Sequence, residues 1–264
     1  MSIMGKVKDL LISRYTPRLG YTHIFIEDEL RHSMLHVQNP FSFFWPQGAP
    51  IAEALISLNN PEGKFLGSVT RTIKPFATLT LSVHELLQQL GKDISLGTIT
   101  VDLVPPRAYC EYLEPNNGGD GRIASPFWMR FYDDLGSQAY VHSIEADRTK
   151  VNGVPRFFSY LITRRNTSTA WESDRTIRLE KGETAVAYIV NHSRRTHHCT
   201  ASWISPESGE LSSKDFKIQS KGVVKFPNSH IGEAFLSVDR ISTSNAKPYV
   251  MLISISNQFA LTHG

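Results

Sequence analysis

The chain has 264 residues, of which 41% are hydrophobic and 20% charged, a balance typical of folded globular proteins rather than disordered or membrane-spanning ones. Its 28 basic and 25 acidic residues leave a formal net charge of +3, too small an excess to indicate a nucleic-acid partner. Only two cysteines are present, Cys110 and Cys199, which excludes the dense disulfide framework of small secreted domains and predicts a reducing, cytoplasmic location.

Residues 1–21 predict a short amphipathic N-terminal helix. Apolar residues recur on one helical face between Met4 and Leu11, so we expect this helix to dock onto the body of the protein. Binding to a membrane surface is the alternative, although the basic side of the helix is sparse. Basic residues interrupt the apolar stretch, which argues against a signal peptide. No apolar run elsewhere reaches the ~20 residues of a transmembrane helix, so no transmembrane segment is predicted.

Residues 22–114 predict a first β-sandwich unit, because short segments rich in β-branched and aromatic residues alternate with clusters of Gly, Pro, Asn and Ser. The turn chemistry of residues 59–63 predicts a hairpin. Leucines at helical spacing predict one short helix over residues 83–90, ending at Gly91. The expected strands are 23–26, 33–37, 52–58, 67–73, 78–82, 97–103 and 109–113.

Residues 183–264 predict a second β-sandwich unit with the same succession of strands, at 184–191, 199–204, 216–218, 223–226, 234–238 and 249–256. Three residues of the first unit recur 145 positions later, and Val101-Asp102 recurs 137 positions later as Val238-Asp239. The three pairs are Pro61 and Pro206, Leu66 and Leu211, and Ile73 and Ile218. We therefore predict a mainly β fold of two tandem antiparallel sandwiches, immunoglobulin-like or jelly-roll-like, related by an internal repeat.

Residues 115–182 interrupt this symmetry as a predicted linker and insertion. They open with a glycine-rich loop and continue as the most aromatic part of the chain, with arginines between the rings. Aromatic faces and guanidinium groups suit sugar rings, nucleobases or a protein partner. The alternative is that these aromatics pack the interface between the two sandwiches. The predicted ligand-binding residues are Trp128, Tyr132, Tyr140, Arg164 and Trp171.

A second group of residues offers acid–base chemistry. His142 lies in a strand-like segment followed by Asp147 and Arg148, which together supply a base, an acid and an anion-binding group. If the protein is an enzyme, these three are the predicted catalytic residues. The alternative is a structural histidine with a hydrogen-bonded ring.

Other site types find little support in the sequence. His192, His197, His198 and Cys199 are suitable zinc ligands, with His230 on a later loop, but strand alternation separates His198 from its neighbours, so no metal site is predicted. The same loop is basic, which is typical of a solvated hairpin tip or of a phosphate contact. No phosphate-binding loop or nucleophile motif is present, so no cofactor is predicted.

The sequence therefore favours a non-catalytic binding or scaffolding protein that presents an aromatic and basic surface to a saccharide or a protein partner, and not to nucleic acid. The first alternative is an enzyme acting on a carbohydrate or another polar metabolite, in a cleft between the two halves, with His142 as acid or base. The second is a structural subunit of a larger assembly, in which exposed sheet edges pair between copies of the chain as a homo-oligomer.

Overall fold

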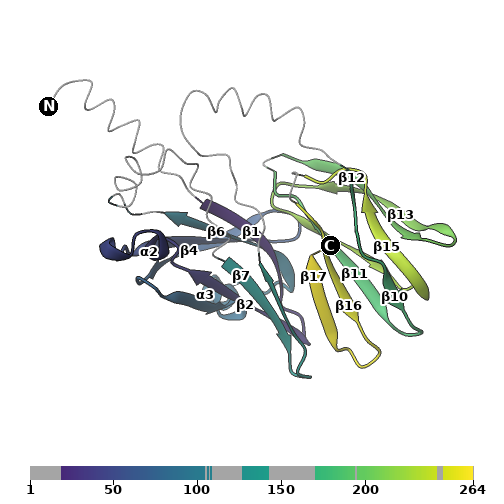
Figure 1. Ribbon diagram of the computed structural model, residues 1–264, viewed down its shortest axis with the longest axis horizontal. Helices are drawn as coiled ribbons and strands as arrows, with labels where there is room; N and C mark the ends of the chain where they lie inside the picture. The colour runs from purple at the N-terminus through teal and green to yellow at the C-terminus, as the bar shows by residue number, and fades with distance from the viewer. Residues whose placement is uncertain are drawn as a thin grey trace, which may run out of the picture.

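The fold consists of antiparallel sheets, which confirms the prediction of a mainly β protein (Figure 1). The computed structural model describes residues 19–104, 106, 108, 127–142, 170–193, 195–242 and 246–263. The N-terminal helix predicted before residue 19 and the strand predicted at 109–113 lie outside these residues, and 19–21 belong to the first strand.

The first unit pairs its strands in the orders β1-β6-β3-β4 and β5-β2-β7-β8. Its strands are β1 (Leu19–Ile26), β2 (Arg31–Gln38), β3 (Ala52–Asn59), β4 (Phe65–Ile73), β5 (Thr78–Ser82), β6 (Leu96–Val104), β7 (Phe127–Asp133) and β8 (Gln138–His142). Short helical segments accompany them in the described part of this unit: α2 (Phe41–Phe44), the 3-10 turn η1 (Pro46–Gly48) and α3 (Val83–Gln89).

Helix α3 confirms the helix predicted from the leucine spacing. Its N-cap is Ser82, whose hydroxyl accepts the backbone N–H of Glu85 at 3.3 Å, and Gly91 follows it with a left-handed φ of +62°. The sequence did not predict α2 or η1, because the aromatic and proline residues that form them lack helical periodicity.

The second unit pairs its strands in the orders β10-β15-β12-β13 and β14-β11-β16-β17, and β9 extends the first of these by pairing with β15. Its strands are β9 (Trp171–Glu172), β10 (Ile177–Leu179), β11 (Thr184–Val190), β12 (His197–Ser205), β13 (Gly209–Ile218), β14 (Val223–Asn228), β15 (Gly232–Val238), β16 (Tyr249–Ile253) and β17 (Phe259–His263).

The two units have the same order of strands in their sheets. If β10 is placed on β1 and each later strand on its counterpart, both sheet orders of the second unit reproduce those of the first. The hairpins also agree in register: Ala52 lies opposite Ile73, and His197 lies opposite Ile218, 145 positions later in each case. Both hairpins are irregular at corresponding places, after Leu58 and after Trp203. Common descent of the two units stays a prediction.

The segment predicted as an insertion supplies strands to both units. Strand β7 pairs with β2 and β8 pairs with β7, so both complete the second sheet of the first unit. Strands β9 and β10 pair with β15 in the second unit. Residues 127–142 and 171–179 therefore belong to the sandwiches themselves.

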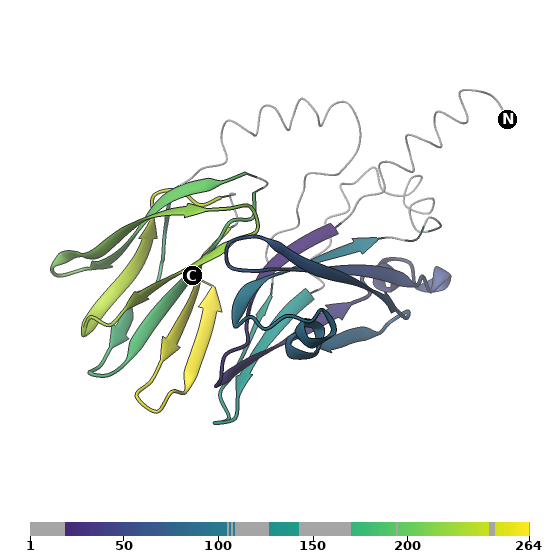
Figure 2. The same ribbon diagram turned by 180° about the vertical axis from the view of Figure 1, so that it is seen from behind.

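The units meet through apolar packing that is continuous with the core of the first unit, and in both views β16 and β17 face that unit (Figure 2). Tyr188 and Met251 of the second unit are buried in this cluster, and the ring of Tyr249 lies 4.3 Å from that of buried His23. The N–H of Val223 donates to the Pro61 carbonyl at 2.9 Å. None of the described helices has the length and apolar character that a membrane span requires.

Candidate functional site

The outer face of the β5-β2-β7-β8 sheet gathers three of the five side chains that we predicted to bind a ligand, Trp128, Tyr132 and Tyr140. Along β7, Phe127, Met129 and Phe131 are fully buried, while the residues between them are only partly buried. Successive strand residues point to opposite faces, so Trp128 and Tyr132 stand together on the outside of the sheet.

Antiparallel register brings further polar and aromatic residues into the same rows. Trp128 lies between His36 of β2 and His142 of β8, whereas Tyr132 lies between His32 and Gln138. Arg130 and Tyr140 form the row between these two. We call this surface the aromatic face and define it by seven residues: His32, His36, Trp128, Arg130, Tyr132, Tyr140 and His142.

Ring contacts hold the aromatic face together. The guanidinium carbon of Arg130 lies 4.9 Å from the ring centre of Tyr132 and 5.9 Å from that of Tyr140. The His32 ring is 5.6 Å from that of Tyr132, and the His36 ring is 6.2 Å from that of Tyr140. Tyr140 remains 58% exposed, so the face offers an accessible ring beside a cation.

Burial also affects the histidine beside Tyr140. The pKa of His36 is lowered from its ordinary value, mainly because burial disfavours the charged ring and also because of the positive charge of Arg130. Its Nδ1 lies 3.1 Å from the hydroxyl of Thr80. At neutral pH His36 is therefore an uncharged polar group next to Arg130.

Of the remaining predicted site residues, the structure describes Trp171 and His142. Trp171 of β9 packs against the core of the second unit and is therefore not part of the aromatic face. Arg164, Asp147 and Arg148 lie outside the described residues. His142 is exposed at the end of β8, an edge strand, where it takes part in the aromatic face.

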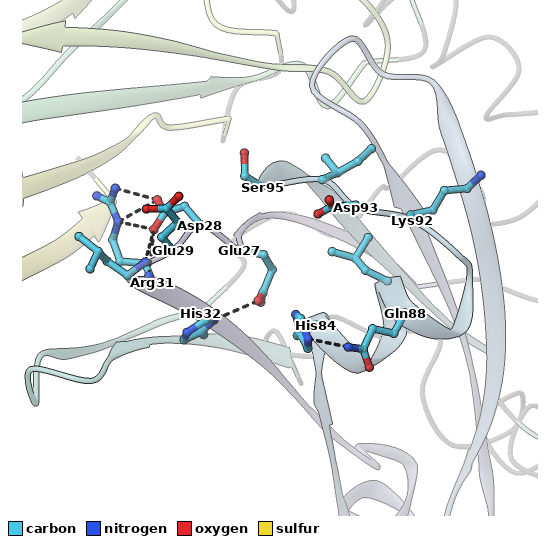
Figure 3. A pocket seen from close by; sticks show the side chains of 13 residues that line it. Glu27, Asp28, Glu29, Arg31, His32, His84, Gln88, Lys92, Asp93 and Ser95 are labelled. Carbon is cyan, nitrogen blue, oxygen red and sulfur yellow. Dashed lines mark hydrogen bonds and ion pairs between the residues drawn. The ribbon is translucent and has the colours of Figure 1, made fainter.

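A polar cavity of about 860 Å³ lies at one end of the first unit and contacts the aromatic face through His32 (Figure 3). The β1–β2 turn forms one side of the cavity, and α3 with the segment after it forms the other. Its lining residues are Glu27, Asp28, Glu29, Leu30, Arg31, His32, His84, Leu87, Gln88, Lys92, Asp93, Ile94 and Ser95. All of them belong to the first unit.

Glu27 is the most buried carboxylate of the cavity, with a side chain only 4% exposed. One carboxylate oxygen accepts the backbone N–H of Ser33 at 2.7 Å, and the other lies 3.3 Å from Nδ1 of His32. Burial raises the pKa of Glu27, and the hydrogen bonds from Ser33 and His32 and the nearby His84 oppose that shift. Figure 3 shows the Glu27 carboxylate between the two imidazole rings.

The remaining charges of the cavity are partly paired. Asp28 forms an ion pair with Arg31 at 2.7 Å, and Nη1 of Arg31 also reaches the sulfur of Met251 in the second unit at 3.2 Å. His84 and Gln88, one helical turn apart on α3, are hydrogen-bonded at 2.8 Å. The cavity thus combines a buried carboxyl with two imidazoles, which is the chemistry that proton transfer requires.

Sequence reasoning missed this cavity because its residues form no motif. Glu27 and His32 flank a turn, and His84 comes about fifty residues later on a helix, so only the fold brings them together. The available signal was a run of charged residues, Glu27 to Glu29, directly after an apolar strand.

Burial and a backbone contact involve two members of the histidine and cysteine cluster of the second unit, Cys199 and His197. Cys199 is buried in the second core, and burial raises the pKa of its thiol to about 12. Nε2 of His197 lies 2.8 Å from the Arg240 carbonyl oxygen. Among the described residues, no group of three or more His, Cys, Asp or Glu side chains is arranged to hold a metal ion.

Comparison with known proteins gives no family for this chain: no family model and no curated protein matches it. Solved structures with a likeness include a Bacteroides uniformis β-glucuronidase (13% identity, 95% of this chain, 27% of that chain, TM-score 0.22). Others are a Bacteroides fragilis structure described as a putative β-galactosidase (11%, 93%, 32%, 0.21) and hazelnut vicilin (9%, 92%, 75%, 0.18). The chain spans about a quarter to a third of the two bacterial proteins. At these TM-scores the likeness carries no argument, and the proposals below rest on the residues of this chain.

Proposed function

We propose that the protein is a non-catalytic binding protein and that the aromatic face binds a saccharide. The observation that carries this proposal is the placement of Trp128, Tyr132 and Tyr140 on one outer sheet surface, around Arg130. Aromatic rings bind the apolar faces of sugar rings at a low cost in conformational entropy, because each has only two side-chain torsions to fix.

The geometry of β7 suits an extended ligand rather than a compact one. Trp128 and Tyr132 are four residues apart on one strand, which separates them by about 13 Å at 3.3 Å per residue. Tyr140 lies on the neighbouring strand, opposite Arg130, and widens the surface between them. A sheet face with rings spaced in this way can contact several units of a sugar chain.

Single substitutions on the aromatic face test the proposal. We expect Trp128→Ala, Tyr132→Ala and Tyr140→Ala each to weaken binding by about tenfold or more to an oligosaccharide that the wild-type protein binds. Aromatic residues at the centre of a binding surface have effects of this size. Calorimetry against neutral and acidic hexasaccharides measures this. Phe65→Ala is the control matched to Tyr140→Ala, because Phe65 on β4 of the other sheet is 60% exposed and Tyr140 is 58% exposed.

Two results would contradict saccharide binding. One is unchanged affinity in all three aromatic variants, with circular dichroism spectra that show intact folds. The other is tight binding to a single-stranded oligonucleotide or a protein partner with no response to any sugar. Either result would assign the aromatic face to a different class of ligand.

A second candidate is an enzyme that uses Glu27 as its acid or base. The observation in its favour is a buried carboxyl with a raised pKa between two histidines in a cavity of about 860 Å³. In that case the protein should release reducing ends from an oligosaccharide panel, and Glu27→Gln should abolish the release. Glu62→Gln, at an exposed turn position, is the control. Wild-type protein without turnover would exclude this candidate on those substrates.

A further inference from the structure

The seven residues of the aromatic face include basic side chains and no acidic ones. The outward positions of β5, β2, β7 and β8 include no Asp or Glu, whereas they include Arg130 and three histidines. Asp133, the carboxylate of β7, is 8% exposed and lies on the buried side of the strand. Arg130 is thus the one permanent charge in these outward positions.

Arg130 differs from the arginine at the cavity in having no acidic partner among the residues that the structure describes. Arg31 forms an ion pair with Asp28 at 2.7 Å, but within the described part of the chain Arg130 has neither an ion pair nor a hydrogen-bond acceptor for its buried Nε. The rings of Tyr132 and Tyr140 hold its guanidinium instead. A partly buried cation without a counter-ion is costly, and binding an anion would offset that cost.

His36 adds a second polar group on the other side of Tyr140. Its Nδ1 is used by Thr80, and its buried Nε2 has no partner among the described residues. Tyr140 contacts both neighbours, with ring distances of 6.2 Å to His36 and 5.9 Å to the guanidinium carbon of Arg130. Two nitrogen atoms for which the described residues supply no hydrogen-bond partner, Nε of Arg130 and Nε2 of His36, therefore lie on either side of the exposed Tyr140 ring.

From this arrangement we infer that the ligand of the aromatic face is an acidic saccharide, whose carboxylate or sulfate group lies on Arg130 while neighbouring sugar rings lie on the aromatic side chains. The planar guanidinium matches the oxygens of such groups with two parallel hydrogen bonds. Because the two tyrosines already restrict Arg130, little side-chain entropy is lost on binding. This inference rests on the proposed saccharide function and adds the charge of its ligand.

A chemically graded ligand series tests the inference. The probes are a chondroitin sulfate hexasaccharide, its desulfated form, and the desulfated form with its carboxylates reduced to alcohols, together with hexagalacturonate and its carboxyl-reduced form. We expect affinity to fall by about tenfold or more when the last acidic group is removed, since hydrogen bonds to charged groups are the strong ones. The step at which it falls distinguishes carboxylate from sulfate recognition.

Substitution of Arg130 assigns that loss to one side chain. We expect Arg130→Gln to bind the acidic oligomers no better than wild-type protein binds the neutral ones, and Arg130→Lys to retain part of the preference. Lys214→Gln is the matched control, since Lys214 lies 5.4 Å from the Phe216 ring in the second unit. Thermal unfolding of each variant verifies that the fold is intact.

The outcomes separate the inference from the proposed function. If no acidic oligomer binds better than its neutral form, or if Arg130→Gln retains the preference, the inference is overturned. Saccharide binding itself would still stand if Trp128→Ala weakens the binding of neutral oligomers. A loss of both acidic and neutral binding in Trp128→Ala, with the acid preference removed only in Arg130→Gln, is the result that supports both.

Discussion

Asn39 and Asn191 occupy corresponding positions in the two units and make corresponding hydrogen bonds. Asn39 follows β2, Asn191 follows the counterpart strand β11, and both residues are fully buried. The Nδ2 group of Asn39 donates to the Ile73 carbonyl at 3.2 Å, and that of Asn191 donates to the Ile218 carbonyl at 2.9 Å. Each asparagine therefore joins the end of one sheet to the last residue of a strand in the other.

The side-chain oxygen atoms of the two asparagines also make corresponding hydrogen bonds. The Oδ1 atom of Asn39 accepts the backbone N–H of Phe41 at 3.1 Å, and that of Asn191 accepts the N–H of Ser193 at 2.9 Å, two residues further on in both cases. Such agreement in side-chain bonding, and not only in strand order, is what a duplicated unit predicts.

We expect Asn39→Ala and Asn191→Ala to destabilise the protein by similar amounts, about 2 kcal/mol or more each, because each leaves several buried backbone groups without a partner. Urea unfolding followed by fluorescence measures the change in the free energy of unfolding. Gln138→Ala is the control, since that amide is exposed on β8. If either asparagine variant is as stable as the control, the amide does not join the sheets.

The hairpin turn of the first unit is fitted against the second unit at Gly63. This residue has a φ of +78°, as its turn sequence predicted, and an added Cβ would lie 2.2 Å from the Ser220 carbonyl oxygen. The carbonyl of neighbouring Pro61 accepts the N–H of Val223 at 2.9 Å. A side chain at position 63 would therefore push the two units apart.

Gly63→Ala should cost more stability than Gly209→Ala, although both residues adopt a left-handed φ (+83° at Gly209), because no atom lies within 4 Å of the added Cβ at position 209. We expect about 1 kcal/mol for the shared backbone strain and at least about 1 kcal/mol more for Gly63→Ala. Differential scanning calorimetry measures both losses. Equal losses would mean that the turn can move away from the second unit freely.

The sequence contained the local structure but not the long-range pairing. The turn before Lys64 is visible in a short window of sequence and is confirmed, whereas the alternation along β7 was not recognised as a strand. That β7 pairs with β2, about ninety residues earlier, depends on register between distant segments, which local patterns do not encode. This is why residues 127–142 were predicted as part of an insertion.

The same distinction between local sequence patterns and long-range contacts applies to the candidate sites. Trp128 and Tyr132 were predicted to bind a ligand from their residue type, and strand β7 is what places both on one face. The contacts of His32 and His36 with this face depend on β2 lying next to β7, and the cavity around Glu27 depends on α3 packing beside a turn. Residues joined only by the fold were the ones that sequence reasoning missed.

Burial protects Cys199 from modification, which thiol labelling can measure. The thiol is 4% exposed and its pKa is raised to about 12, so almost no thiolate forms at pH 8. In a Cys110→Ser variant, we expect labelling of the folded protein by iodoacetamide to be at least about a hundredfold slower than labelling in urea. Fast labelling without denaturant would contradict the burial of Cys199 in the second core.

Glu27 gives the first unit a specific dependence of stability on pH. Its pKa in the folded protein is raised above the ordinary value of 4.5, so the folded state binds this proton more tightly than the unfolded state. The stabilising contribution is therefore fully present below pH 4.5 and is lost as the pH rises through the raised pKa. At neutral pH the buried, ionised carboxylate of Glu27 therefore lowers the free energy of unfolding.

Glu27→Gln removes this titration while keeping an amide oxygen that can accept the N–H of Ser33. We expect the stability of the variant, relative to wild type, to be higher at pH 7 than at pH 4.5, because only the wild-type protein pays for a buried charge at pH 7. Urea unfolding of both proteins at the two pH values measures the difference, with Glu62→Gln as the exposed control. A relative stability that is the same at both pH values would show that the hydrogen bonds from Ser33 and His32 cancel the effect of burial at Glu27, and a change in the opposite direction would show that they outweigh it.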